Sequence, residues 1–151
     1  MATIPGLLPP IIMISLLIPT ATGYGFSAGA ATPLLKPCPS SPNCVSSQAE
    51  EPARRISPFA LSGTLAETLT RLERAIRAFP RASVVLREGP YLKAEFRTRL
   101  GFVDDVEFLV DMEQGLVQVR SASRTGYWDL GVNRRRMEDI RKVYRELKDS
   151  P

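Results

Sequence analysis

Four short runs of alternating apolar and polar residues constrain this chain more than any other feature of its sequence. They read SVVLRE (83–88), YLKAEFRTR (91–99), DDVEFLVDM (104–112) and LVQVRSAS (116–123). Alternation with a period of two is typical of strands that are buried on one face. Gly89-Pro90, Gly101 and the triplet EQG (113–115) separate the runs and are typical of turns. The pattern therefore predicts an antiparallel meander of four strands.

Helical patterns flank this meander on both sides. The segment 63–81 opens with a capping box, Thr64 followed three residues later by Glu67, continues with an apolar stripe and ends at Pro80. From Asn133 onward a second apolar stripe predicts another helix, and the run RRISPFAL (54–61) reads as a first short strand. We expect an α+β domain with a largely antiparallel sheet of about five strands and two helices packed on one face. The expected order is strand, helix, four strands, helix.

The first part of the chain has a different composition. Residues 1–35 contain no charged side chain, the apolar run 11–18 has the length of a signal-peptide core, and Ala28-Gly29-Ala30 fits a cleavage pattern. The missing Lys or Arg before that run departs from an ordinary signal, and a disordered apolar tail is the alternative. We expect a signal peptide or apolar N-terminal segment over 1–30, a Pro/Ser-rich extended segment over 31–53, and a single α+β domain over 54–149.

Two cysteines support export. Cys38 and Cys44 are six residues apart in KPCPSSPNCVSS (36–47), where Pro39, Pro42 and Asn43 favour a tight loop. In an oxidising compartment two cysteines this close are expected to form a disulfide. A redox pair is the other interpretation, but the spacing is not C-x-x-C. We therefore expect a structural disulfide and an exported protein of the periplasm or cell envelope.

Composition excludes several classes of function. The 151 residues include no histidine, which removes Ser-His-Asp and Cys-His catalysis and every histidine-ligated zinc or haem site. We expect no cofactor and no metal. The net charge is +4, with 16 Arg against 4 Lys, and Arg is the residue suited to bidentate pairing with carboxylate or phosphate. No basic tract is interleaved with aromatic residues, so nucleic acid is not an expected partner.

Two adjacent acids raise the question of what partners them. Strand alternation places Asp104 on the apolar face of its strand and Asp105 on the opposite, polar face. An unpaired buried carboxylate would be strongly destabilising or would take up a proton, so Asp104 requires a donor. The candidate donors are Arg120, Arg124, Ser121, Ser123 and the cluster 134–136.

The cluster of Arg134, Arg135 and Arg136 is itself unusual, because cations at a helix start oppose the helix dipole. Asp104, Asp105, Asp129 or a bound anion would compensate them. One interpretation is an internal network of ion pairs, which is common in proteins. The other is an anion-binding pocket formed by Arg120, Arg124 and the cluster, with the acids orienting them and Tyr127 and Trp128 as a lid.

A hydrolase that uses Asp104 or Asp105 as general base is a competing hypothesis. Neighbouring strand residues point to opposite faces, so these two carboxylates would not act as a dyad without a bulge. No D-x-D-x-D loop is present for a carboxylate metal site. We therefore do not expect an enzyme. A structural interaction module is a third hypothesis, and an exposed apolar patch would mark it.

The stretches CPSSPNCVSS (38–47), YLKAEFRTRLGFVDDVEF (91–108) and VRSASRTGYWDLGVNRRR (119–136) together resemble the domain-of-unknown-function family 1499. The resemblance spans roughly Cys38 to Leu147. It implies a small, mostly bacterial protein, often exported or lipid-anchored, with relatives in plastids and no established activity or catalytic residues.

From the residues and the resemblance we expect a non-catalytic cell-envelope domain. It would bind an anionic small molecule, a lipid headgroup or an envelope protein through an Arg-rich end of its sheet, and membrane association is compatible with this hypothesis.

Overall fold

A computed structural model describes residues 35–147; the predicted N-terminal segment 1–30 lies outside the described residues, as do 31–34 and 148–151. The described chain forms six strands and two helices. In chain order they are β1 (Cys44–Ser46), β2 (Phe59–Ala60), α1 (Leu65–Arg77), β3 (Ala82–Glu88), β4 (Tyr91–Arg97), β5 (Val103–Asp111), β6 (Leu116–Ser123) and α2 (Val132–Glu146).

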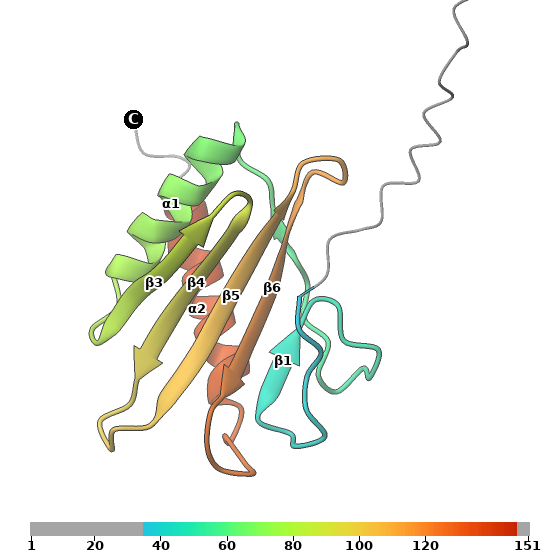
Figure 1. Ribbon diagram of the computed structural model, residues 1–151, viewed down its shortest axis with the longest axis vertical. Helices are drawn as coiled ribbons and strands as arrows, with labels where there is room; N and C mark the ends of the chain where they lie inside the picture. Colours follow the sequence, from blue (N-terminus) through green and yellow to red (C-terminus); the bar gives the residue numbers. More distant parts are fainter. Residues whose placement is uncertain (1–34, 148–151) are drawn as a thin grey trace, which may run out of the picture. The chain divides into compact units, whose positions relative to one another are not determined.

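The strands build one antiparallel sheet in the order β1-β6-β5-β4-β3, and β2 also pairs with β6. The strands β3 to β6 form the predicted meander, each pairing with the next. Both helices lie on the same side of the sheet, behind it in the view of Figure 1. The α+β prediction is thus confirmed, and the side of the sheet that faces the viewer in Figure 1 is called the outer face below.

One strand of the sheet was not predicted. The three residues of β1 pair with β6, with Cys44 opposite Ala122 and Ser46 opposite Arg120. The backbone N–H of Ser123 continues the ladder by donating to the carbonyl of Asn43 at 3.0 Å. The residues of β1 lie among prolines and serines, and the sequence predicts only an extended segment there. The pairing of β1 with β6 depends on how the whole domain folds.

Local signals explain the first helix. Thr64 and Glu67 form the predicted capping box: the Thr64 hydroxyl accepts from the Glu67 N–H at 3.3 Å, and the Glu67 carboxylate accepts from the Thr64 N–H at 2.8 Å. This reciprocal pair satisfies backbone donors that would otherwise lack partners. The apolar stripe of the helix is buried against the sheet through Leu69, Leu72 and Ile76.

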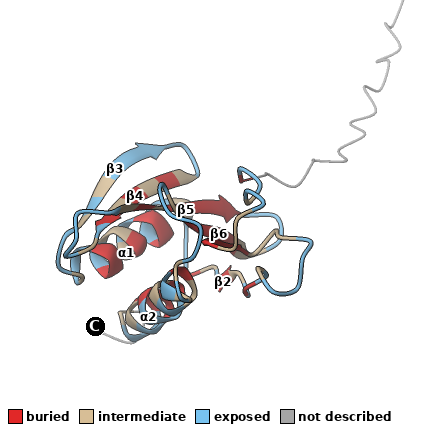
Figure 2. Cartoon of the chain, turned by 90° about the horizontal axis from the view of Figure 1, so that it is seen from below, coloured by how far each residue is buried: buried red, intermediate tan, exposed pale blue. Residues whose placement is uncertain are grey.

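The core lies between the sheet and the two helices. Figure 2 shows buried residues on the sides of α1, α2 and the sheet that face one another. Phe59 forms an edge-to-face contact with Phe108 at 5.8 Å and a tilted contact with Tyr144 at 5.7 Å. These contacts join β2, β5 and α2, so the short strand β2 contributes an aromatic anchor to the core.

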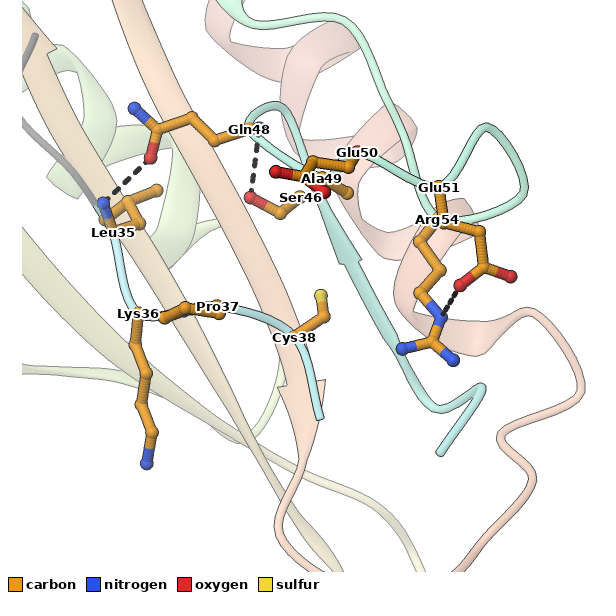
Figure 3. Close-up of a pocket in the computed structure, with 10 residues that line it drawn as sticks. All are labelled: Leu35, Lys36, Pro37, Cys38, Ser46, Gln48, Ala49, Glu50, Glu51 and Arg54. Atoms are coloured by element: carbon orange, nitrogen blue, oxygen red, sulfur yellow. Dashed lines mark hydrogen bonds and ion pairs between the residues drawn. The ribbon is translucent and has the colours of Figure 1, made fainter. Parts of the chain in front are cut away.

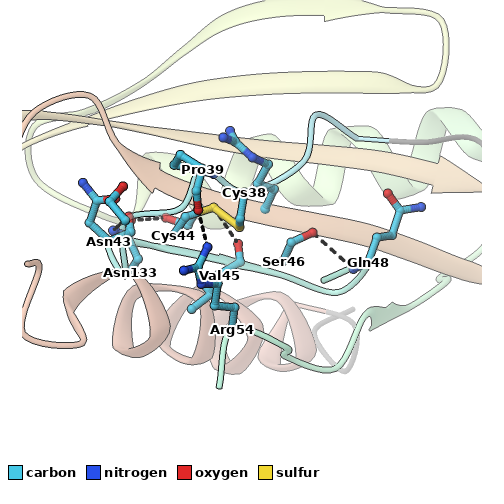
Figure 4. Close-up of a disulfide and its surroundings, with 12 residues drawn as sticks. Cys38, Pro39, Asn43, Cys44, Val45, Ser46, Gln48, Arg54 and Asn133 are labelled. Carbon is cyan, nitrogen blue, oxygen red and sulfur yellow. Dashed lines mark hydrogen bonds between the residues drawn. A yellow bond between two sulfur atoms is a disulfide. The ribbon is translucent and has the colours of Figure 1, made fainter. Parts of the chain in front are cut away.

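The predicted disulfide between Cys38 and Cys44 is confirmed, with 5.7 Å between the two Cα atoms. Cys44 is fully buried beside β6. Figure 4 shows Arg54 beneath the same loop, where its guanidinium donates to the carbonyl of Pro39 and, at 2.6 Å, to that of Ser40. The disulfide and Arg54 together fasten the segment before β1 to the domain.

Candidate functional site

Asp104 lies on the helix-covered face of β5, as the alternation predicts, and is only 3% exposed. In the register of the sheet it stands opposite Phe96 of β4 and Ser123 of β6. Asp105 stands opposite Glu95 and belongs to the outer face. Because consecutive strand residues point to opposite faces, the sheet itself separates the two carboxylates.

Arg136 of α2 is the partner of Asp104. Its Nη2 donates to Oδ2 of Asp104 at 2.5 Å, and the two side chains are 10% and 4% exposed. The guanidinium carbon also lies 5.1 Å from the ring centroid of Phe96. A charge-assisted hydrogen bond of this kind offsets the desolvation of a buried carboxylate. Among the donors that the sequence left open, the structure selects one member of the cluster 134–136.

Asn133 lies at the centre of the surrounding hydrogen-bond network and is fully buried. Its side-chain oxygen accepts from the Ser121 hydroxyl at 2.6 Å and from Arg136 at 2.8 Å. Its amide nitrogen lies within 3.0 Å of three acceptors, on Asn43, Ser123 and Asp129. Sequence analysis missed this residue, because asparagine at a helix start usually acts as an exposed cap. The sequence signal that pointed to Asn133 was the absence of an acidic residue from the first turn of α2.

Asp129 supplies the negative charge that the start of α2 lacks. Its carboxylate accepts from the backbone N–H groups of Gly131 and Asn133, both at 2.9 Å. Burial by itself would raise the pKa of Asp129, but the hydrogen bonds from Asn133 and Gly131 outweigh it and hold that pKa below its usual value. Asp129 therefore stays ionised and caps the helix, which is the compensation that the arginine cluster predicts.

Arg124 belongs to a different network, on the outer face. It donates to Asp105 at 3.0 and 2.8 Å and also to Glu95. Lys93 lies 3.1 Å from the same Asp105 carboxylate. The hydrogen bond from Arg124 is the main cause that lowers the pKa of Asp105, against a smaller opposing effect of burial. This predicted site residue is therefore engaged within the sheet.

Arg120 is buried on the outer face rather than grouped with the other arginines. Its Nη1 donates to Glu107 at 2.6 Å, and Tyr91 donates its hydroxyl proton to the other oxygen of Glu107 at 2.7 Å. Burial, followed by the hydrogen bond to Glu107, raises the pKa of Tyr91. Sequence analysis did not single out Glu107 or Tyr91 as partners of Arg120, because cross-strand register decides the pairing.

The remaining two predicted arginines contact carbonyl oxygens. Arg134 donates to Arg55 at 3.1 Å and to Ala53 at 2.7 Å, and Arg135 donates to Leu130 at 3.0 Å. The five predicted arginines therefore lie on both faces of the sheet and along α2. The structure does not bring them together around one cavity.

Exposed apolar side chains gather at the end of the sheet where Asp104 lies. Two loops form it, residues 98–102 between β4 and β5 and residues 124–131 between β6 and α2; together they are called the loop end. Both loops lie at the lower end of the sheet in Figure 1, and the Arg124 N–H donates to the Val103 carbonyl at 3.0 Å where they meet. The large apolar residues exposed here are Leu100, Phe102, Tyr127, Trp128 and Leu130.

Tyr127 and Trp128 do not close over a cavity. They are 63% and 72% exposed, and their rings contact each other edge-to-face at 5.8 Å. A groove of about 270 Å³ does lie nearby, between Phe79, Phe96 and the start of α2, with Arg135 and Arg136 on its wall. Neither aromatic residue lines it.

A larger hollow of about 410 Å³ lies away from every predicted site residue except Cys38. Figure 3 shows Leu35, Lys36 and Cys38 on one side of it and Glu51 and Arg54 on the other. Arg54 pairs with Glu51 at 2.8 Å, so the strongest charges on that wall neutralise each other.

The charged groups at these sites are paired with one another. Asp104 is buried and ion-paired with Arg136, so its carboxylate is engaged within the domain. Within residues 35–147 no three acidic or cysteine side chains gather to hold a metal ion. No helix in the same range is both long and apolar enough to cross a membrane.

Comparison with known proteins identifies the chain at the level of its family. A family model described as "Protein of unknown function (DUF1499)" matches residues 34–143, which is most of the chain and nearly all of its described part. No curated protein matches the chain.

Proposed function

The chain belongs to the DUF1499 family, and we propose that it is an exported, non-catalytic domain of the cell envelope that docks on an anionic partner through its loop end. The observation that carries this proposal is the concentration of exposed apolar side chains there. Leu100 and Leu130 are 83% and 82% exposed, and Trp128 is 72% exposed. Large apolar residues grouped at one place on a soluble surface mark an interaction site.

The charges at the loop end support an anionic partner. Arg99 has no side-chain partner among the described residues, and Arg97 is 58% exposed despite its ion pair with Glu95. Asp129 is the only carboxylate within the two loops, and its oxygens are already bonded to the start of α2. Glu95 and Asp105 offset the charges of Arg97 and Arg124 beside the loops, so the open positive charge of the loop end is carried by Arg99 and by the exposed part of Arg97.

Export is supported by two features at the other end of the chain. The apolar run 11–18 followed by small residues has the pattern of a secretory signal. The disulfide between Cys38 and Cys44 is a bond that persists in oxidising compartments and is rare in the cytosol.

The partner is better accommodated on an exposed surface than in an enclosed pocket. Arg124 and Arg136 would form the core of an anion pocket, but acids of the same domain occupy their guanidinium groups. No contact in the structure favours the hydrolase hypothesis, because Asp104 and Asp105 lie on opposite faces of the sheet.

Trp128 allows a direct test, because it is the only tryptophan in the chain. The full chain is produced in a bacterial host with 5-hydroxytryptophan at position 128, whose emission can be excited apart from the ordinary tryptophan of other proteins, and is then mixed with the solubilised envelope extract. Docking predicts that Trp128 becomes less accessible to acrylamide, and that Leu100→Asp removes this protection. Met112→Asp is the matched control, because Met112 is 50% exposed in the turn at the opposite end of the sheet.

Two results would contradict the proposal. Full acrylamide access to Trp128 in the presence of the extract would exclude docking through the loop end. Free thiols at Cys38 and Cys44, trapped by alkylation in intact cells, together with recovery from the cytosol, would exclude export.

A further inference from the structure

Resting on the proposed function, we infer that the loop end docks on an anionic lipid bilayer. Leu100, Trp128 and Leu130 enter the boundary between headgroups and acyl chains, and arginines around them contact the headgroup phosphates.

The shape of the loop end favours a fluid surface. A leucine that is more than four-fifths exposed, as Leu100 and Leu130 are, projects beyond its neighbours instead of forming part of a flat patch. Specific protein partners bury a continuous surface on the order of 800 Å² on each side, with closely packed cores. Separate side chains on two loops fit a bilayer better, because lipids rearrange around each of them.

The aromatic residues have the chemistry of a membrane interface. Tyr127 and Trp128 each combine a large apolar ring with a polar atom, and their rings contact each other. Tyr and Trp are enriched where headgroups meet acyl chains, because one part of the ring system is apolar and another remains hydrated. Phe102, 53% exposed on the neighbouring loop, adds a purely apolar ring to the same end.

The loop that carries these side chains is fixed in place before any partner binds. Asn43 donates to the Gly126 carbonyl at 2.5 Å, and Asp129 accepts two backbone hydrogen bonds at the other end of the loop. A preorganised loop loses little conformational entropy on docking. Such order serves a binding surface, because the exposed side chains contribute nothing to the core of the domain.

Leu130 gives an independent sign of function in this loop. Its backbone has φ of 52°, in the left-handed region that favours glycine. A bulky residue in that conformation is destabilising, and exposure of the leucine to water adds no compensation. Insertion into a bilayer supplies the missing burial for this side chain.

The charge pattern selects an anionic membrane. Arg99 and Arg135 lie in or directly beside the two loops and have no acidic partner among residues 35–147, and Arg97 stays 58% exposed beside Glu95. Juxtamembrane arginines are attracted to anionic headgroups, and the attraction declines with ionic strength. Arg135 also lines the groove beside Phe96, together with Asp139.

The test uses the full chain and vesicles of phosphatidylcholine, with or without roughly 30% of the anionic lipid phosphatidylglycerol. Trp128 emission, acrylamide quenching and co-sedimentation are measured. Because Trp128 is the sole tryptophan, its emission reports on the loop end even if the apolar segment 1–30 also contacts lipid. We expect a blue shift and protection from acrylamide on anionic vesicles, both weakening with added salt.

Matched variants locate the contact. Leu100→Asp with Leu130→Asp is expected to weaken binding, measured by the Trp128 signal, by at least about tenfold, because two inserted side chains become charged. Arg99→Gln with Arg135→Gln should reduce the preference for anionic over neutral vesicles. Met112→Asp, at the opposite end of the sheet, should bind as wild type does. Circular dichroism of each variant verifies that the fold is retained.

The outcomes separate this inference from the proposed function. Protection of Trp128 by envelope protein but not by anionic vesicles would overturn the bilayer and leave the docking function standing with a protein partner. Protection by neither would overturn both. Equal binding of the Leu100→Asp, Leu130→Asp variant and of Met112→Asp would show that lipid is not contacted through the loop end, which also overturns the inference.

Discussion

The pair of Asp104 and Arg136 should be the most sensitive electrostatic contact in the fold. The two side chains are 4% and 10% exposed and meet at 2.5 Å, so removing one charge leaves the other desolvated. Breaking a buried pair in this way costs about 3–5 kcal/mol. Arg136 would keep its bond to Asn133 and its contact with the Phe96 ring. We therefore expect Asp104→Asn to lower the free energy of unfolding by about 3 kcal/mol, the lower end of that range.

Thermal unfolding followed by circular dichroism measures this effect. For a domain of this size each kcal/mol shifts Tm by roughly 4 °C, so Asp104→Asn should unfold about 12 °C below wild type. Arg136→Met should lose a similar amount. The double variant should be more stable than the sum of the two losses implies, with a coupling of about 2 kcal/mol, because both members of the pair are then gone.

Arg124→Ala is the control, since Arg124 is 41% exposed and its ion pairs are open to solvent. It should shift Tm much less than Asp104→Asn does. The reasoning is refuted if Asp104→Asn unfolds within about 2 °C of wild type, or if the losses of the two single variants simply add in the double variant.

Three further predictions concern other parts of the molecule. Because Arg124 lowers the pKa of Asp105, the stabilisation from that carboxylate is complete above its unfolded pKa of about 3.9 and is lost as pH falls through the lower folded value. Urea unfolding between pH 5 and 3 should therefore show a shallower loss of stability in Arg124→Ala than in wild type, and identical slopes would contradict the assignment. Leu130→Gly should raise the free energy of unfolding by up to about 1 kcal/mol by relieving the left-handed conformation, while vesicle binding weakens. A stability loss in that variant would show that Leu130 is a structural residue. Replacing Cys38 and Cys44 by serine should cost about 2 kcal/mol, because the disulfide closes only a short loop; chemical denaturation measures this, and an unchanged midpoint would mean that Arg54 alone holds the segment.

Much of the fold follows from short-range patterns. The alternation in residues 91–123 predicts three central strands and the face on which Asp104 lies, because side-chain direction in a strand repeats every two residues. The Thr64 and Glu67 capping box marks the start of α1, because both partners lie within one helical turn. The spacing of Cys38 and Cys44 predicts their disulfide for a similar reason.

Short-range patterns do not show which arginine pairs with which acid. Several arginines were equally good candidates for Asp104, and the packing of α2 across the sheet brings Arg136 to it. Cross-strand register, in turn, places Arg120 opposite Glu107 on the other face. The hypothesis of one arginine-lined pocket required those side chains to converge, but neighbouring positions along a strand or helix point in different directions.

Local patterns in the sequence thus account for both helices, the four-stranded meander, the family resemblance and the face of the sheet on which Asp104 lies, because periodicity, caps and turns are interactions between near neighbours in the chain. Three features depend on tertiary packing: β1 joins the sheet at β6, Asn133 connects α2 to the segment before β1, and two separate loops with exposed apolar residues lie at the same end of the sheet. Each of those features joins residues far apart in the chain, and their pairing depends on how the whole domain packs.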